Sequence, residues 1–327
     1  MYALNRRRFA AALAAAPLVA APRLGRAEAF PAKPVKIIVP FAPGGPTDTS
    51  ARIVGEALAR ELGVAVVVDN VPGAGAAIGT LKVATSTPDG YTLLWGTPSS
   101  LTVAPSVRND LKYEALTSFA PISLVASAPF VLVVKQGLGV ADLAGLIELA
   151  KSRPGQLNYG STGIAGSAHM LTELFLRTAG IQAVHIPYGG GAPMVGALRQ
   201  GALDFLFDTP TTVAPLVQAG AGLPLAVTSA TRWPELPQVK SLAELGMKGF
   251  DVSTWFGLLA PAGTPSDVLR TLSDKVMAAS RTDAVRKALQ AAGFIAVGSS
   301  PGEFVERIRV EGRRWAEVAQ AANIKVQ

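Results

Sequence analysis

The sequence predicts an α/β protein that is built as two similar lobes. Short apolar runs alternate with segments of helical period along the 327-residue chain, which is typical of a parallel sheet covered by helices. The alternation stops and then restarts near Phe130, which indicates a second sheet. A chain of this length also favours two domains over one. We therefore expect each lobe to contain a mostly parallel sheet flanked by helices.

The first β-α-β series begins with the apolar run VKIIV at 35–39, which predicts a strand. A helix is expected over 48–62, because apolar residues recur on one face and Gly63 stops the pattern. The remaining elements of this series are a strand at 64–69, a helix over 75–85 and a strand at 91–96. Strands that alternate with helices in this way predict parallel pairing.

The second series begins with the run FVLVVK at 130–135, which also predicts a strand. Further strands are expected at 183–188, 203–208 and 223–229, and helices over 140–152, 167–179, just before Gly201 and near 212–219. Each of these segments is short and is bounded by Gly, Pro or polar residues, as expected of a second compact sheet with its own helices.

The tail carries two further helix starts, TPSD at 264–267 and SPGE at 300–303, each with a capping residue followed by Pro. The run STWFGLLAP before them indicates a strand that returns to the first lobe. We therefore expect lobe 1 to hold residues 30–125 plus 250–327 and lobe 2 to hold 126–249. The crossover strands between the lobes would act as a hinge.

Residues 1–29 predict an export signal that is removed near Ala29. Arg6–Arg8 precede Phe9 and a modest apolar region, an order typical of a twin-arginine (Tat) signal, with a general secretory signal as the alternative. The chain contains no Cys, which excludes disulfides, thiolate zinc sites and a lipoprotein anchor. A disulfide-free exported protein with a large core fits the bacterial periplasm.

The basic charge of the chain belongs largely to this segment. The segment holds five Arg and one Glu, so the mature chain carries a net charge of +3 rather than the +7 of the full chain. No basic patch interleaved with aromatic residues occurs in the mature sequence. We therefore expect no nucleic-acid partner, and we expect a monomer.

Loops rich in Gly, Ser and Thr follow several predicted strands, where ligands bind in open α/β sheets. They span 41–48, 70–79, 96–100, 159–169, 187–193 and 207–212. They contain no Lys or Arg, and their charged residues are Asp48 and Asp208. Glycine lets a ligand approach bare N–H groups, and a following helix N-terminus favours negative charge. These loops therefore predict an anion site that is built from the backbone.

The same loops argue against nucleotide binding and catalysis. PGAGAAIG provides only G-x-G-x-x-x-G, without the Lys of a P-loop. His169 and His185 both lie in apolar surroundings, no G-x-S-x-G motif occurs, and metal-ligand spacing is absent. We expect no catalytic residue, no cofactor and no metal. Asp48 and Asp208 fit helix capping as well as ligand contact, whereas Phe41 and Tyr188 stand beside glycine-rich turns that could border a cleft.

Several stretches, taken together and in order, resemble the Bug family, also called the tripartite tricarboxylate transporter substrate-binding proteins. They are PFAPGGPTD, PGAGAAIG, PDGYTLL, YGSTGIAGSAH, HIPYGGGAP, LDFLFD, LLAPAGTP and SPGEFVERI, and they cover nearly the whole mature chain. The resemblance implies a type II periplasmic-binding-protein fold that closes on a small carboxylate. The ligand would be held mainly by backbone amides, hydroxyls and water, and delivered to membrane transporter subunits of the tripartite tricarboxylate type. A receptor that serves a two-component sensor kinase is the alternative.

Carried over by position, the resemblance and the loops give one set of candidate ligand-binding residues. They are Phe41, Ala42, Gly44, Gly45, Asp48, Thr97, Ser99, Ser161, Thr162, Ser167, His169, Tyr188 and Asp208. The sequence departs from the family pattern at Val71, Ala76, Gly189 and Thr209, and the departures at Val71 and Gly189 replace basic residues. These differences bear on the identity of the ligand rather than on the fold.

Overall fold

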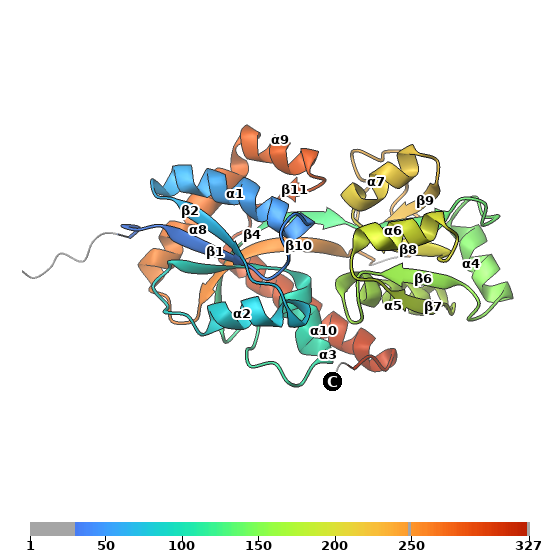
Figure 1. The fold of residues 1–327 in the computed structure, drawn as a ribbon, viewed down its shortest axis with the longest axis horizontal. Coiled ribbons are helices and arrows are strands. Elements are labelled where there is room, and N and C mark those ends of the chain that lie inside the picture. The colour runs from blue at the N-terminus through green and yellow to red at the C-terminus, as the bar shows by residue number, and fades with distance from the viewer. Residues whose placement is uncertain (1–29, 248–249, 326–327) are drawn as a thin grey trace, which may run out of the picture.

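The computed structural model describes residues 30–247 and 250–325, so the expected export signal lies outside the described residues. Two sheets, each flanked by helices, lie end to end in two lobes (Figure 1). Of the helices in the described part of the chain, none has both the length and the apolar character needed to cross a membrane.

Lobe 1 contains a six-stranded sheet that combines strands from both ends of the described chain. The strands are β1 (Val35–Val39), β2 (Val66–Asn70), β3 (Thr92–Gly96), β4 (Phe119–Pro129), β10 (Ser253–Pro261) and β11 (Ile295–Ala296), in the order β11-β4-β10-β3-β1-β2. The helical segments are α1 (Pro46–Leu62), η1 (Ala74–Ala76), α2 (Ala77–Ala84), η2 (Ser99–Val103), α3 (Ala104–Val107), α8 (Ser266–Arg281), α9 (Asp283–Ala291) and α10 (Pro301–Ala321). Helix α1 starts two residues earlier than expected, because Pro46 fits the first helical position.

Lobe 2 contains a five-stranded sheet from the middle of the chain. The strands are β5 (Val131–Lys135), β6 (Asn158–Ser161), β7 (Val184–Pro187), β8 (Phe205–Asp208) and β9 (Gly222–Val227), in the order β7-β6-β8-β5-β9. The helices are α4 (Leu143–Ser152), α5 (Ser167–Ala179), α6 (Gly191–Arg199) and α7 (Pro210–Gln218). Hydrophobic clusters lie on both faces of this sheet, so its inner strands β5 and β8 are apolar along most of their length, as expected of strands covered on two sides.

The strand pairing confirms the parallel β-α-β units and corrects the expectation of mostly parallel sheets. Strand β1 pairs in parallel with β2 and β3, and β6 pairs in parallel with β7 and β8. The pairs β10–β3, β10–β4, β11–β4, β5–β8 and β5–β9 are antiparallel, so both sheets are mixed. The physical reason is the crossing between lobes: the chain leaves lobe 1 along β4 and returns along β10, so these neighbours run in opposite directions.

The two crossings are joined to each other where they pass between the lobes. The Phe130 N–H donates to Oγ1 of Thr228 (2.8 Å), and the Thr228 hydroxyl in turn donates to the carbonyl of Val252. The Val252 N–H donates back to the carbonyl of Thr228 (3.1 Å). Thr228 is fully buried, so these bonds hold both crossings at one place. The exact residue limits of the two lobes stay a prediction.

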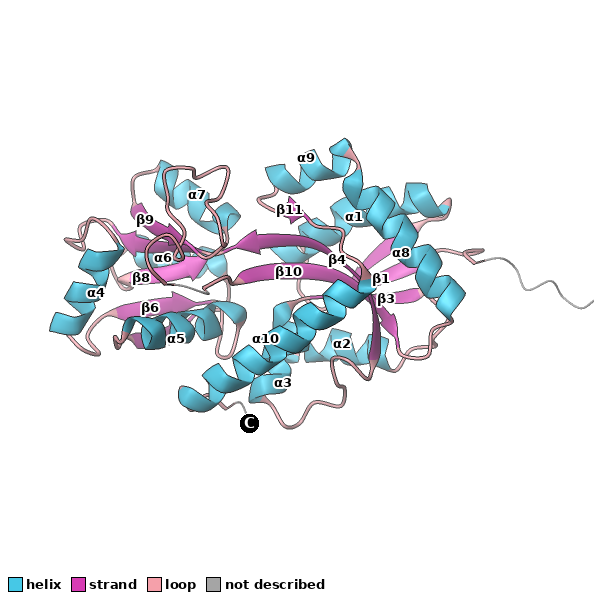
Figure 2. Cartoon of the chain, turned by 180° about the vertical axis from the view of Figure 1, so that it is seen from behind, coloured by secondary structure: helices cyan, strands magenta, loops and turns pink. Residues whose placement is uncertain are grey.

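Helix α10 also joins the lobes, and Figure 2 shows it running across both of them from behind. Phe304 and Ile308 near its start pack into the core of lobe 1. Trp315 and Val318 near its end pack into the core of lobe 2. The tail is therefore not confined to lobe 1, because the last turns of this helix contribute to the opposite core.

Candidate functional site

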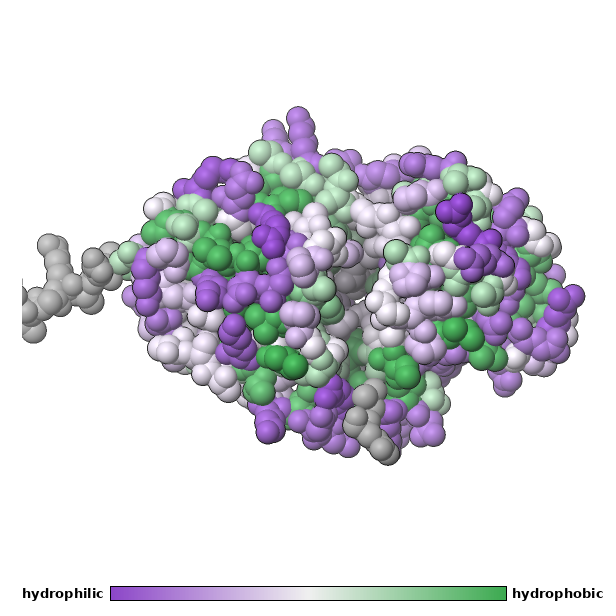
Figure 3. All heavy atoms as spheres, viewed as in Figure 1, coloured by the Kyte–Doolittle hydropathy of each residue, from purple (hydrophilic) through white to green (hydrophobic). Residues whose placement is uncertain are grey.

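A cavity of about 430 Å³ lies between the lobes, at the carboxyl ends of β1, β6 and β8. Its lining residues come from both lobes and from the crossing strands: Phe41, Ala42, Pro43, Gly45, Pro46, Thr47, Thr97, Ser99, Phe130, Thr162, Ser167, Ala168, Gly189, Gly190, Gly191, Asp208, Thr209, Thr212, Thr254 and Phe256. Figure 3 shows the seam between the lobes, where pale residues of near-neutral hydropathy gather. The Oγ atoms of Ser99 and Ser167 lie 3.0 Å apart across this seam, so a hydroxyl bridge joins the two walls.

The N-termini of four helices converge on this cavity. They belong to α1, α5, α6 and α7, and residues of the first turn of each helix line the wall. None of these helices has a side-chain hydrogen bond at its N-cap, and three of the N-caps are Gly. In contrast, α4, α9 and α10 are capped by Asp142, Thr282 and Ser300. The helices around the cavity therefore present unsatisfied N–H groups and the positive ends of their dipoles.

The charge of the cavity wall is unusual for an anion site. Among the described residues that line it, there is no Lys or Arg, and Asp208 is the only ionisable side chain. No cluster of three or more His, Asp or Glu in the described part of the chain could hold a metal ion. The described wall offers backbone N–H groups and hydroxyls, together with the carboxylate of Asp208.

The first loop is shaped by a network centred on Asp48. The Gly44 N–H donates to Oδ2 of Asp48 (2.9 Å), Arg52 Nε donates to the same oxygen (3.0 Å), and Asn70 Nδ2 donates to Oδ1 (3.0 Å). Burial alone would raise the pKa of Asp48, but these hydrogen bonds together lower it below its usual value. Gly44 has a φ of 86°, a left-handed conformation that favours glycine. Gly44 and Asp48 do not line the cavity; they hold the shape of the loop that does.

His169, Ser161 and Tyr188 also lie behind the wall rather than in it. Oγ of Ser161 lies 2.6 Å from Nε2 of His185, and Nδ1 of His169 accepts the Ala165 N–H (2.9 Å). The two imidazole rings stack with centroids 3.8 Å apart. Burial and the neighbouring His185 lower the pKa of His169 to about 4, so its ring is neutral at pH 7 and can accept this bond.

These contacts give the histidine pair a supporting role. The pair holds the loop that carries Thr162 and Ser167 into the cavity. The Tyr188 N–H donates to the Ser161 carbonyl (2.9 Å), and the Tyr188 side chain packs in the hydrophobic cluster of lobe 2. The sequence placed these three residues in the right loops, but their side chains turn away from the cavity because they complete hydrogen bonds and packing inside lobe 2.

The remaining eight candidates line the cavity together: Phe41, Ala42, Gly45, Thr97, Ser99, Thr162, Ser167 and Asp208. Sequence reasoning did not single out Thr212 or Gly189–Gly191 as contacts, although they belong to loops that it identified. It missed Phe130, Thr254 and Phe256 of the crossing strands completely. These residues lie in apolar strand runs, and only the crossing between the lobes brings them to the cavity.

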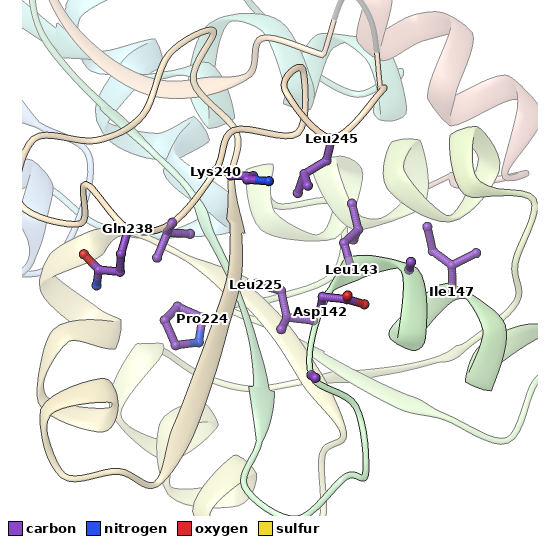
Figure 4. A pocket seen from close by; sticks show the side chains of 11 residues that line it. Asp142, Leu143, Ile147, Pro224, Leu225, Gln238, Lys240 and Leu245 are labelled. Carbon is purple, nitrogen blue, oxygen red and sulfur yellow. The ribbon is translucent and has the colours of Figure 1, made fainter.

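A second hollow, of about 390 Å³, lies on lobe 2 beside α4 and β9. Figure 4 shows its mostly apolar wall, with Leu143, Ile147 and Leu245, together with Asp142 and Lys240. Asp142 already accepts the Gly145 N–H (2.8 Å) as the cap of α4. None of the glycine-rich loops reaches this hollow, so we do not assign it as the site.

Comparison with known families confirms the resemblance seen in the sequence. The model of the tripartite tricarboxylate transporter family receptor matches residues 50–324. Protein BugT of Bordetella pertussis is 36% identical over 302 residues, which cover 92% of this chain and 93% of that protein.

Solved structures agree in fold over nearly the same length. The structure of Rpa4515 from R. palustris with adipate is 35% identical, with a TM-score of 0.81, and the match covers 90% of this chain and 99% of that one. MatC from Rhodopseudomonas palustris with bound malate is 29% identical, with a TM-score of 0.77, and the match covers 88% and 99%. The chain belongs to the tripartite tricarboxylate transporter receptor family, and it is a periplasmic solute-binding protein of the Bug type with a two-lobed α/β fold.

Proposed function

We propose that this protein captures a small carboxylate in the cavity between its lobes and delivers it to membrane transporter subunits of the tripartite tricarboxylate type. The observation that carries the proposal is the set of four uncapped helix N-termini around a cavity whose described lining residues include no Lys or Arg. The relatives with bound adipate and malate support a carboxylate as the ligand class.

The energetics support binding without an ion pair. Each helix N-terminus contributes about 0.3–1 kcal/mol to a nearby anion, and up to about 2 kcal/mol when partly buried. Each hydrogen bond to a charged group adds about 1.5–3 kcal/mol. A few such contacts reach the roughly 8 kcal/mol of micromolar affinity. We expect binding and release without turnover, because Ser161 and the two histidines do not line the cavity.

The test is to identify the bound molecule and then to change its charge. Protein purified in native form is denatured, and the released small molecule is identified by mass spectrometry; a carboxylate is expected. Calorimetric titration then compares this acid with its carboxamide over a range of salt concentrations. The carboxamide should bind much more weakly, because it directs N–H groups at N–H groups, and moderate salt should have little effect on the acid. A steep salt dependence, or a carboxamide that binds as tightly as the acid, would overturn the proposal.

A further inference from the structure

The two aspartates of the glycine-rich loops differ in one respect. Both oxygens of Asp48 accept hydrogen bonds, from Gly44, Arg52 and Asn70. Oδ1 of Asp208 accepts the Thr209 N–H (2.6 Å), but its Oδ2 is buried and accepts no hydrogen bond from the described residues. An unpaired buried carboxylate oxygen is costly, so it calls for a functional explanation.

Helix capping does not provide that explanation. The N-cap of α7 is Thr209, and α7 has no side-chain hydrogen bond at its N-cap. Asp208 instead ends β8 in the wall of the cavity, and its side chain is 7% exposed. Capping was one of two interpretations of this residue from the sequence, and the geometry removes it.

Gly191 and Thr212 pack around Oδ2 of Asp208, and the glycine leaves this edge of the carboxylate without a larger side chain against it. A Cβ atom added to Gly191, which also lines the cavity, would lie 3.3 Å from Oδ2 of Asp208 and 3.0 Å from Cγ2 of Thr212. Any side chain at position 191 would therefore crowd the unpaired oxygen. Among the described lining residues there is no Lys or Arg to neutralise it, and only the hydroxyls of Thr209 and Thr212 lie close enough to moderate its charge, so a ligand could supply the missing partner.

We propose that Asp208 selects ligands that carry a hydrogen-bond donor, a hydroxyl or an ammonium group, in addition to the carboxylate, and that Oδ2 accepts this donor. The inference rests on the proposed capture of a carboxylate and specifies its chemistry. The helix N-termini donate to the carboxylate of the ligand. A second carboxylate facing Oδ2 would repel it, and a methylene group there would leave it without a hydrogen bond. A donor group satisfies it. Burial raises the pKa of Asp208 to about 6, so the side chain is still mostly an acceptor at pH 7.5.

The test uses carboxylates matched in skeleton. Succinate, malate and aspartate share a four-carbon dicarboxylate skeleton. Succinate carries no additional donor, malate carries a hydroxyl and aspartate carries an ammonium group. Propionate, lactate and alanine form the same series for monocarboxylates. Dissociation constants are measured by calorimetry at pH 7.5 with the purified protein. Within the series that binds, a donor-bearing member should bind about tenfold to a hundredfold more tightly than the member without one, as expected for a hydrogen bond to a charged group.

The variant Asp208→Asn should abolish this preference. Its amide oxygen can still accept the Thr209 N–H, but an NH₂ group replaces Oδ2 and meets the ligand donor as a second donor. The matched control is Asp204→Asn, since Asp204 lies just before the same strand, is 8% exposed and is paired with Lys135. Asp204 does not line the cavity, so this control should keep the preference of the wild type.

The outcomes separate the two proposals. If none of these acids binds and the molecule released from native protein is not a carboxylate, carboxylate capture fails and this inference falls with it. If the acids bind with equal affinity within a series, or if Asp208→Asn keeps the preference, only the inference about Asp208 is overturned. If Asp208→Asn does not fold, Gly191→Ala takes its place, because the added methyl group crowds Oδ2; an unchanged preference in that variant would also overturn the inference.

Discussion

The substitution Gly45→Ser tests whether the N-terminus of α1 is held open for a ligand. Gly45 is the N-cap of this helix, and its φ of −85° and ψ of 175° are those that a capping Ser adopts. A Cβ atom at this position meets no atom within 4 Å, so the side chain fits without strain. Its hydroxyl would accept an N–H of the first turn and would occupy the position that we assign to the ligand carboxylate.

The magnitude follows from counting the free donors. Pro46 has no N–H, and the Thr49 N–H already donates to the Gly45 carbonyl (2.9 Å), so the N–H groups of Thr47 and Asp48 remain for a ligand. Loss of one of these two hydrogen bonds to a carboxylate removes about 1.5–3 kcal/mol, or about tenfold to a hundredfold in the dissociation constant. Stability should rise by a few tenths of a kcal/mol, the usual difference between Ser and Gly at an N-cap.

Calorimetry of the identified ligand and urea unfolding provide the two measurements. The control is Gly302→Ser, at an exposed helical position away from the cavity with open space around the added atom, and it should leave affinity unchanged. The reasoning is refuted if Gly45→Ser binds the ligand as tightly as the wild type while the protein remains folded.

Three further predictions concern His169, the crossing between the lobes and the export signal. Burial lowers the pKa of His169 from 6.5 to about 4, so the unfolded chain takes up a proton at a higher pH than the folded chain does. The free energy of unfolding should therefore fall as the pH drops from about 6.5 to about 4, by up to about 1.4 kcal/mol per pH unit. Burial also lowers the pKa of the stacked His185, so His169→Asn, which keeps an acceptor but cannot be protonated, should reduce this slope in urea unfolding without removing it. An unchanged slope would show that His169 does not contribute to it. Thr228→Val leaves the buried Phe130 N–H unpaired and should cost about 1–3 kcal/mol in the same assay, whereas Thr172→Val, which removes a hydroxyl bonded within one helix, should cost less. Changing all three of Arg6–Arg8 to Lys should leave precursor in the cytoplasm in a fractionation assay; undiminished export through the general secretory route would disprove a twin-arginine signal.

The sequence by itself determined much of the local structure and the composition of the loops around the cavity. Apolar periodicity located most strands and helices to within a few residues, since those patterns reflect which face of each element is buried, but it did not locate β4, β11, α3 or α9. The Gly, Ser and Thr of loops such as 41–48 and 187–193 indicated backbone amides as the binding groups, because only small residues let a ligand reach them. The part of the cavity wall that the structure describes likewise contains no Lys or Arg.

Only the tertiary structure decided what each polar side chain does. Asp48 lies in the first turn of α1 and Asp208 ends β8, and both belong to glycine-rich segments of the sequence. Arg52 and Asn70 pair with the Asp48 carboxylate, whereas Asp208 keeps an oxygen without a hydrogen bond. His169 is turned away from the cavity by its hydrogen bond with the Ala165 N–H and by its stacking on a residue of a neighbouring strand. The mixed sheets, the cavity wall contributed by the crossing strands and the bridging end of α10 depend on pairings between segments far apart in the chain. Local pattern cannot specify such pairings, because the free energy that selects them comes from packing and hydrogen bonds that exist only after the lobes have formed.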